Sequence, residues 1–162
     1  MLAVITARST NNCIGKNGTM PWHIPEELKY FQRLTTGNTV IMGRRTYEAI
    51  GHPLKDRFNI IVSSTINIHT NECITVPSLD EALHAAKKNK DIFIIGGAQL
   101  YEEAIPLVDV MYITEINQFI EDGDTFFPSF DESQFDKTIN KTCTDSLCTY
   151  TVYTRKDRQS WK

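Results

Sequence analysis

The sequence predicts an α/β fold of three layers, with a mostly parallel central sheet of about eight strands and an antiparallel C-terminal hairpin. Strand-like and helix-like segments alternate from the N-terminus through Ile116. The segment Gln134–Arg155 then alternates threonine with apolar residues on both sides of Thr144-Asp145-Ser146, as a hairpin does. With 162 residues and no repeat or linker-like stretch, the chain is expected to form one domain, 1–162.

Short apolar segments rich in β-branched residues indicate the strands. Several of them, such as Ile92–Ile95, are continuously apolar, which is typical of strands covered on both faces. The expected strands are Leu2–Ala7, Thr39–Met42, Phe58–Ser63, Cys73–Val76, Asp91–Ile95 and Val110–Ile116.

Helix signals lie between these strands. Pro25 is followed by two glutamates, a combination that the first turn of a helix favours. Ser78 and Glu81 form a capping box. The expected helices are Pro25–Leu34, a short segment after Gly43, a segment from Ser78 to about Lys88, and Ala98 to about Ile105.

The composition is that of a globular protein, with 41% hydrophobic and 23% charged residues. No apolar run approaches the ~20 residues of a membrane-spanning helix. The first residues, Met1–Arg8, indicate a strand rather than a signal peptide, so we expect a cytoplasmic protein.

Charge is divided unevenly along the chain. Residues 1–60 carry eight Lys/Arg and four Asp/Glu, whereas residues 61–162 carry nine and sixteen. Nucleic-acid binding needs a concentrated basic surface, which an acidic protein with a basic N-terminal part does not suggest. The charge distribution instead suits a small anionic ligand that is held by a few arginines. An uneven solvated surface is the alternative, and a monomer is expected.

The four cysteines are too few and too scattered for a disulfide framework. Cys143 and Cys148 flank the hairpin turn and can face each other, but in a reducing compartment both are expected to remain thiols. No CxxC pair and no histidine at ligand spacing is present, so no metal site is expected.

Glu27 is the most informative side chain. On a helical wheel of ~100° per residue it lies between Phe31 and Leu34 in the middle of the apolar face, while Glu26 lies on the polar arc. Burial raises the pKa of a carboxyl group and makes it a candidate for proton handling or ligand anchoring. The alternative is a partly exposed glutamate that interacts with the helix dipole.

Two strand-to-helix turns can accept phosphates. Gly96-Gly97 follows a buried strand and precedes a helix, which lets backbone amides approach a ligand closely. Gly43-Arg44-Arg45-Thr46 has the same order and adds two cations and a hydroxyl, and Ser63-Ser64 ends the next strand. Each segment can instead be a structural turn or a solvated face, but together they favour a dinucleotide cofactor.

The segment Ser9–Thr19 is expected to be a long loop without secondary structure, and such loops are often lids. Trp22 lies between Pro21 and Pro25 and could stiffen the C-terminal end of this loop. The alternative is that Trp22 is a core aromatic residue and that the loop only connects two elements.

These segments, in this order, resemble dihydrofolate reductases of the bacterial chromosomal type. The resemblance covers essentially the whole chain, and its most specific part is the combination of the tryptophan-to-acid segment with the glycine pair. The matching stretches include Met20–Leu28, Val40–Thr46, Arg57–Ile61, Ile94–Ala98, Tyr112–Thr114 and Gly123–Pro128.

The resemblance implies a dihydrofolate-reductase-like fold and the NADPH-dependent reduction of 7,8-dihydrofolate to 5,6,7,8-tetrahydrofolate. This reaction belongs to one-carbon metabolism and supports thymidylate, purine and amino-acid synthesis. Hydride would pass to pterin C6, and Glu27 would hold the 2-amino group and N3 of the pterin and promote protonation at N5. Trp22 and Thr114 are the other two implied catalytic residues. Antifolates such as trimethoprim or methotrexate are expected to bind.

The resemblance also implies the remaining site residues. Arg57 would clamp the α-carboxylate of the substrate's glutamate. The implied substrate-binding residues are Ile5, Ala7, Glu27, Leu28, Phe31, Ile50, Leu54, Arg57, Ile95 and Thr114. The implied NADPH-binding residues are Ala7, Ile14, Gly15, Asn17, Gly18, Thr19, Met20, Gly43, Arg44, Arg45, Thr46, Ser63, Ser64, Gly96, Gly97, Ala98, Gln99, Leu100 and Tyr101.

Two local features follow from the same resemblance. The Gly96–Gly97 peptide bond is expected to be cis. Asn17–Met20 is expected to form a mobile lid whose closed form Asp124 tethers.

Two other functions fit parts of the sequence. A reductase of the same fold from riboflavin synthesis is one, but Glu27 on the apolar face argues against it because that acid recognises the pterin. A non-catalytic nucleotide- or folate-binding module is the other, and it would bind NADPH without oxidising it.

Overall fold

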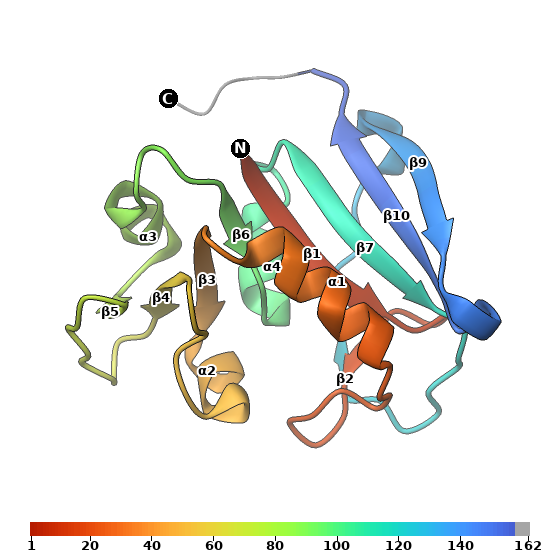
Figure 1. Ribbon diagram of the computed structural model, residues 1–162, viewed down its shortest axis with the longest axis horizontal. Coiled ribbons are helices and arrows are strands. Elements are labelled where there is room, and N and C mark those ends of the chain that lie inside the picture. The colour runs from red at the N-terminus through yellow and green to blue at the C-terminus, as the bar shows by residue number, and fades with distance from the viewer. Residues whose placement is uncertain (158–162) are drawn as a thin grey trace.

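The computed structural model describes residues 1–157 and contains an eight-stranded sheet (Figure 1). β1 pairs in parallel with both β6 and β7, whereas β10 runs antiparallel to β7 and to β9. The predicted mostly parallel sheet with a C-terminal hairpin is therefore confirmed. In spatial order the strands are β5 (Cys73–Val76), β4 (Phe58–Val62), β3 (Thr39–Gly43), β6 (Ile92–Ile94), β1 (Leu2–Arg8), β7 (Val110–Ile116), β10 (Cys148–Arg155) and β9 (Phe135–Thr142).

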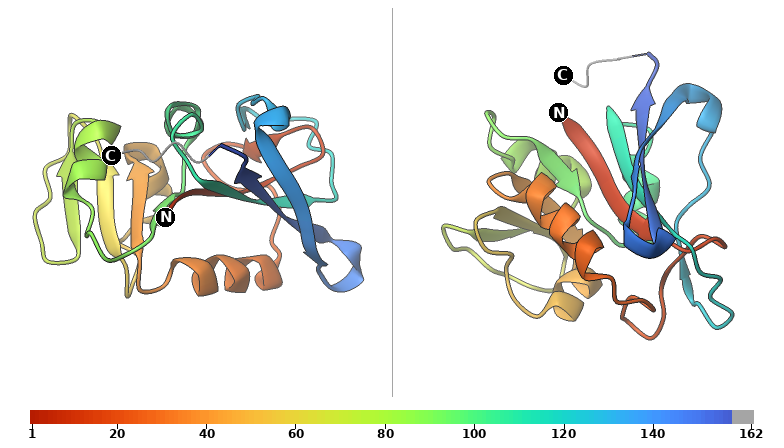
Figure 2. Two further views of the ribbon diagram at one scale, coloured as in Figure 1. Left: turned by 90° about the horizontal axis from the view of Figure 1, so that it is seen from above. Right: turned by 45° about the vertical axis from the view of Figure 1, so that its right-hand side comes forward.

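Helices cover both faces of this sheet, and Figure 2 shows α1 (Pro25–Thr35) on the side opposite α4 (Ala98–Ala104). Alternate residues of β1 pack against the two helical layers. Leu2 and Val4 lie in the cluster of α3 (Leu79–Ala85) and α4. Ala3 and Ile5 pack in the cluster that α1 and α2 (Arg44–Ile50) cover. All four residues are buried, which explains why these strands lack a polar alternation.

Strand and helix bounds agree with the sequence prediction to within one residue, except at α3. This helix ends at Ala85 rather than near Lys88, and Ala86 is already extended. Ala86 is the last residue there that packs against the core, and Lys87 and Lys88 are exposed. The helix stops where no apolar face remains to be buried.

The expectation that Ser9–Thr19 lacks secondary structure is wrong. β2 (Cys13–Gly15) lies within it and pairs antiparallel with β8 (Thr125–Phe126) in a second, small sheet. Strands of three and two residues are too short to show an alternation in the sequence.

The expectation that Cys143 and Cys148 remain thiols is also wrong. The structure joins them in a disulfide across the end of the hairpin, with their Cα atoms 5.3 Å apart. The Cys143 amide donates a hydrogen bond of 2.8 Å to the Cys148 carbonyl, which holds the two residues face to face around η2 (Thr144–Ser146).

The outer strand β9 ends the sheet. Of its eight residues only Phe135 is buried, and the others are exposed. A short 3-10 helix, η1 (Glu132–Gln134), leads into it.

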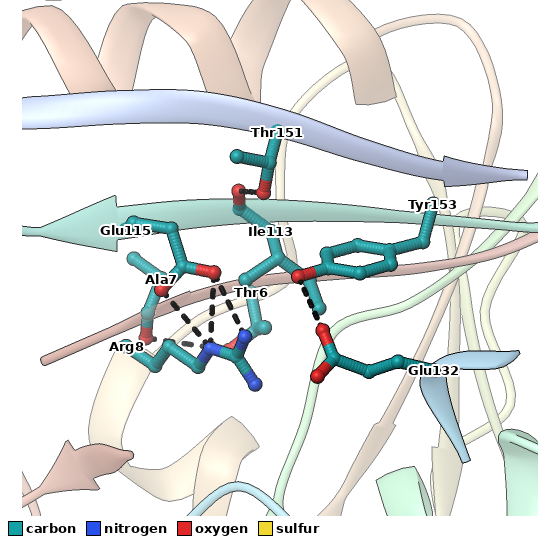
Figure 3. Close-up of polar contacts among 8 residues, drawn as sticks. All are labelled: Thr6, Ala7, Arg8, Ile113, Glu115, Glu132, Thr151 and Tyr153. Carbon is teal, nitrogen blue, oxygen red and sulfur yellow. Dashed lines mark hydrogen bonds and ion pairs between the residues drawn. The ribbon is translucent and has the colours of Figure 1, made fainter. Parts of the chain in front are cut away.

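Arg8 links β1 to β7 beneath the sheet (Figure 3). Its Nη2 donates to Glu115 Oε1 at 2.8 Å, and its guanidinium lies over the ring of Phe127 at 5.7 Å. Nearby, the Tyr153 hydroxyl donates to Glu132 Oε1 at 3.1 Å (Figure 3). Only 13% of the Arg8 side chain and 29% of the Glu115 side chain are exposed, so the pair is mostly shielded from water.

Within residues 1–157, no helix is both long enough and apolar enough to span a bilayer.

We expect Glu115→Ala to lower the free energy of unfolding by about 2 kcal/mol, because it leaves the shielded Arg8 cation without its carboxylate. Urea denaturation measures this. Glu48→Ala, which removes the exposed partner of Arg44, serves as the control and should change stability by less than about 1 kcal/mol. If Arg8→Met combined with Glu115→Gln is as unstable as Glu115→Ala, the unpaired charge is not the cause.

Candidate active site

Glu27 lies in the first turn of α1 and is buried, with 7% of its surface exposed. Burial raises the pKa of its carboxyl group from 4.5 to about 7. Within residues 1–157, no group donates a hydrogen bond to this carboxylate. The wheel's placement of Glu27 on the buried face is therefore confirmed.

Glu26 has the opposite environment. Its Oε2 accepts a hydrogen bond of 3.0 Å from the Thr144 amide in the hairpin turn, and this backbone hydrogen bond lowers the pKa of Glu26. Two adjacent glutamates thus differ in role: one anchors the hairpin and the other enters the interior.

The start of α1 is fixed by apolar packing rather than by a side-chain cap. The N-cap residue is Ile24, whose carbonyl accepts hydrogen bonds from the amides of Glu27 and Leu28 at 3.1 and 3.3 Å. Ile24 is buried in one cluster with Trp22 and Ala7. This packing sets the direction in which Glu27 points.

Unpaired donors accompany this cluster. The indole nitrogen of Trp22 and the hydroxyl of Tyr150 are buried without hydrogen-bond partners among residues 1–157. The ring of Tyr150 also stacks on Tyr30 of α1, with centroids 4.2 Å apart. Buried polar groups usually have hydrogen-bond partners, so these two donors are exceptions that lie in the same cluster of residues.

Thr114 is buried on β7, opposite Ala7 on β1 and Tyr150 on β10. The register therefore places the predicted Thr114 between Ala7 and Tyr150, which both belong to this cluster. Sequence reasoning missed Tyr150 and Tyr30; the Tyr30 position on the apolar face of the wheel was the available signal.

Five of the predicted substrate residues meet in one apolar cluster. Leu28 is not a member of it and remains 37% exposed. Arg57 lies at the margin, where its guanidinium is 5.9 Å from the ring of Phe31 and its Nη1 donates to Thr35 Oγ1 at 3.0 Å. The predicted substrate residues that belong to this cluster or pack against it are Ile5, Phe31, Ile50, Leu54 and Ile95.

The two glycine turns also meet. β3 and β6 are neighbours, with Ile41 opposite Ile94, and the Gly43 amide donates to the Gly96 carbonyl at 2.9 Å. The Gly96–Gly97 bond is cis, as expected, and Gly96 has φ +132°. A Cβ at Gly96 would lie 3.3 Å from Thr46 Oγ1, so only glycine fits without displacement there.

Polar groups surround these turns. Arg44 pairs with Glu48 at 2.8 Å, and Arg45 is exposed. Ser63 Oγ accepts the amides of Thr65 and Ile66, so this serine closes a turn.

The other implied phosphate residues differ in exposure. Ala98 is half-buried and Gln99 and Ser64 are exposed. Leu100 and Tyr101 instead lie in the core, where the Tyr101 hydroxyl donates to the Ile5 carbonyl at 2.9 Å.

The predicted lid segment is connected to Asp124. Its Oδ2 accepts the Asn17 amide at 2.9 Å, and this hydrogen bond lowers the pKa of Asp124. Gly18 has φ +78°, and Thr19 closes a turn with Lys16.

The implied NADPH-binding residues at the end of this segment and before it lie in different surroundings. Met20 is 50% exposed. Ile14 packs against the α3–α4 cluster and Ala7 belongs to the Trp22 cluster, so the structure does not bring these two into one cluster. Gly15 pairs with Thr125 in the small sheet.

No three His, Cys, Asp or Glu side chains within residues 1–157 are grouped as a metal site would need.

The dihydrofolate reductase family model matches residues 1–156. The chain belongs to the dihydrofolate reductase family. A dihydrofolate reductase of Bacillus subtilis (strain 168) is 43% identical over 135 residues, which are 83% of this chain and 80% of that protein. Dihydrofolate reductase type 3 of Salmonella typhimurium is 42% identical over 130 residues, 80% of each chain.

A solved structure has the same fold as this reductase. Dihydrofolate reductase from Enterococcus faecalis, complexed with NADP(H) and RAB-propyl, matches with a TM-score of 0.83 over 97% of both chains at 36% identity.

The raised pKa of Glu27 should make the stability of this reductase depend on pH. The neutral carboxyl group is the form that tolerates burial, so its contribution is complete below pH 4.5 and is lost as the pH rises through about 7. Relative to Glu27→Gln, the wild type should lose about 3 kcal/mol of unfolding free energy from pH 4.5 to pH 8.

Urea denaturation across this pH range tests the prediction without substrate or cofactor. Glu26→Gln is the matched control, because the pKa of Glu26 is lowered rather than raised. The contribution of Glu26 to folding stability is therefore present above its ordinary pKa and is lost on acidification. Parallel pH profiles for the wild type and Glu27→Gln would contradict a raised pKa.

Proposed function

We propose that the chain reduces 7,8-dihydrofolate to 5,6,7,8-tetrahydrofolate with NADPH, and that Glu27 promotes the protonation of the pterin at N5. Membership of the dihydrofolate reductase family and the structural likeness to a relative complexed with NADP(H) support the overall reaction. The buried Glu27, with a pKa of about 7, is the observation that carries the residue assignment. At neutral pH such a group is populated in both protonation states, as a general acid requires.

The substrate would lie with its pterin against Glu27. The carboxylate has free acceptor positions for the 2-amino group and N3, and the orphan donors of Trp22 and Tyr150 can hold a water beside it. Thr114, Ala7 and Leu28 complete the surroundings. The apolar cluster of α1 and α2 offers the rings a dry wall, and Arg57 offers a charge-assisted hydrogen bond to the glutamate α-carboxylate.

The carboxyl ends of β3, β4 and β6 fit the phosphates of NADPH. Gly96 and Gly43 leave the backbone open to close approach, and Arg44 and Arg45 supply positive charge. When bound, NADPH supplies the hydride that pterin C6 receives. The Asn17–Met20 segment, held to Asp124, is proposed as a lid over the nicotinamide end.

We also propose that the chain is a single, monomeric, cytoplasmic domain, that its product feeds one-carbon metabolism, and that antifolates such as trimethoprim bind at the same site. One assay distinguishes the proposed reductase from the alternative, a non-catalytic binding module. NADPH absorbance falls on addition of dihydrofolate if the chain is a reductase and stays constant if it only binds.

Glu27→Gln should leave the fold intact and lower turnover at neutral pH by at least about 100-fold, because the group that promotes proton transfer is lost. Steady-state NADPH oxidation measures the effect. Glu26→Gln should retain near-wild-type turnover, since Glu26 faces the hairpin. Near-wild-type rates for Glu27→Gln would refute its role.

Arg44→Leu should lower the preference for NADPH over NADH. The loss of one charge-assisted hydrogen bond to the 2′-phosphate predicts a roughly tenfold fall in the ratio of kcat/KM values. Arg33→Leu, on the exposed side of α1, should leave the ratio unchanged. An equal fall with both cofactors would show that Arg44 does not contact the 2′-phosphate.

A further inference from the structure

The tip of the β9–β10 hairpin lies beside the N-terminal end of α1 (Figure 2). The disulfide between Cys143 and Cys148 closes this tip, and the two cysteines are five positions apart in the chain. Both cysteines are buried, whereas the turn between them, residues 144–147, is exposed. Neither cysteine has a part in the proposed reaction.

Two polar contacts join the hairpin to the first turn of α1. The Thr144 amide donates a hydrogen bond of 3.0 Å to Glu26 Oε2. Lys141 Nζ, on β9, lies 3.9 Å from Glu26 Oε1. Glu26 is adjacent to Glu27 in the chain, so the position of the hairpin tip and the position of Glu27 are connected through one turn of helix.

The disulfide also belongs to the apolar cluster that orients α1. Cys143 and Cys148 share this cluster with Ile24, which is the N-cap residue of the helix. Tyr150 belongs to the cluster as well, two positions after Cys148 on β10. Its ring stacks on Tyr30 of α1, with centroids 4.2 Å apart. The two sulfur atoms therefore lie in the packing that positions the helix.

The turn has a backbone conformation that its residues disfavour. Asp145 and Ser146 have φ of +60° and +55°, in the left-handed region where two consecutive residues with side chains are unusual. Such a conformation persists only where the surrounding structure holds it. The disulfide supplies this constraint because it joins the two residues that flank the turn. When the bond is broken, the turn can relax and release Glu26.

We propose that Cys143 and Cys148 form a reversible redox site, and that oxidation of the pair lowers the KM for dihydrofolate. The inference rests on the proposed function and on the proposed cytoplasmic location, since disulfides in that compartment are usually transient and redox-sensing. In the disulfide form, the hairpin tip holds α1 in the position that the substrate requires. In the dithiol form the tip is released, and substrate binding must order it again.

The chemical step is a thiol–disulfide exchange. Two protein thiols and one molecule of glutathione disulfide give the Cys143–Cys148 disulfide and two molecules of glutathione, so two electrons and two protons leave the protein. In the reverse direction, one thiolate of dithiothreitol attacks a sulfur of the pair and breaks the S–S bond. The second thiolate of the reagent then attacks the mixed disulfide. The reagent leaves as a cyclic disulfide, and both cysteines are thiols again.

The test compares the oxidised and reduced forms of the wild-type chain. One sample is treated with glutathione disulfide and the other with dithiothreitol, and each is freed of reagent and assayed without oxygen. Alkylation after unfolding counts the thiols by mass, with two expected in the oxidised form, from Cys13 and Cys73, and four in the reduced form. The KM for dihydrofolate should be about fivefold higher in the reduced form, which is the effect of one hydrogen bond of ordinary strength.

The KM for NADPH should be the same in both forms. Gly43 and Gly96 lie at the carboxyl ends of β3 and β6, and β1 and β7 separate these strands from β10. A change at the hairpin tip therefore leaves the proposed phosphate turns in place. This difference between the two KM values distinguishes a local effect on α1 from a general loosening of the fold.

Cys143→Ala combined with Cys148→Ala gives a chain that cannot form the disulfide. Its KM for dihydrofolate should match that of the reduced wild type after either treatment. Cys73→Ala is the matched control, because it removes a buried free cysteine that packs in another cluster, and it should keep the wild-type response. The wild-type comparison does not depend on the folding of either variant.

The outcomes separate the redox site from the reductase. Equal KM values for dihydrofolate in forms that differ in thiol count would overturn the redox site, and so would four thiols after treatment with glutathione disulfide. A response that persists in the double cysteine variant, or an equal rise in both KM values, would overturn it as well. If neither form oxidises NADPH with dihydrofolate, the proposed function fails instead.

Discussion

The placement of one carboxyl group out of water is the constraint on which the site depends. Transfer of an ionised carboxylate into a poorly hydrated position is unfavourable by several kcal/mol, so the group takes up a proton more readily instead. α1 meets this constraint because Ile24 and Trp22 pack its first turn into the protein. Glu27 is then directed inward while Glu26 holds the hairpin outside. A change in the packing beneath Ile24 would alter the chemistry without touching Glu27 itself.

Parallel pairing supplies the second requirement, which is to bring distant segments to one edge. β3 and β6 are separated by about fifty residues in the chain, yet their register sets Gly43 against Gly96. The amide of one glycine and the carbonyl of the other are thereby joined, and Thr46 fits against the same turn. The two ends of the parallel strands therefore differ in residue type. Glycines and arginines follow the carboxyl ends of these strands, and lysines precede their starts.

The sequence predicts what depends on local pattern. Apolar runs located the strands of the main sheet, and the helical wheel placed Glu27 because burial in a helix follows directly from spacing. It does not predict contacts that depend on tertiary placement. The Tyr30–Tyr150 stack, the Arg8–Glu115 pair and the pairing of β2 with β8 each join segments more than one hundred residues apart. The disulfide requires a different kind of information. The sequence places Cys143 and Cys148 at facing positions of the hairpin, but bond formation also depends on the distance between them in the folded chain.

The exposed outer strand β9 has a consequence for how molecules behave when crowded together. A free strand edge offers unpaired amides and carbonyls to any neighbouring chain, which is a common start of aggregation. Here the edge carries Asp136, Lys137 and Lys141, charges that must lose water before another strand can pair. The last hairpin thus ends the sheet in a form that discourages its continuation into a fibre.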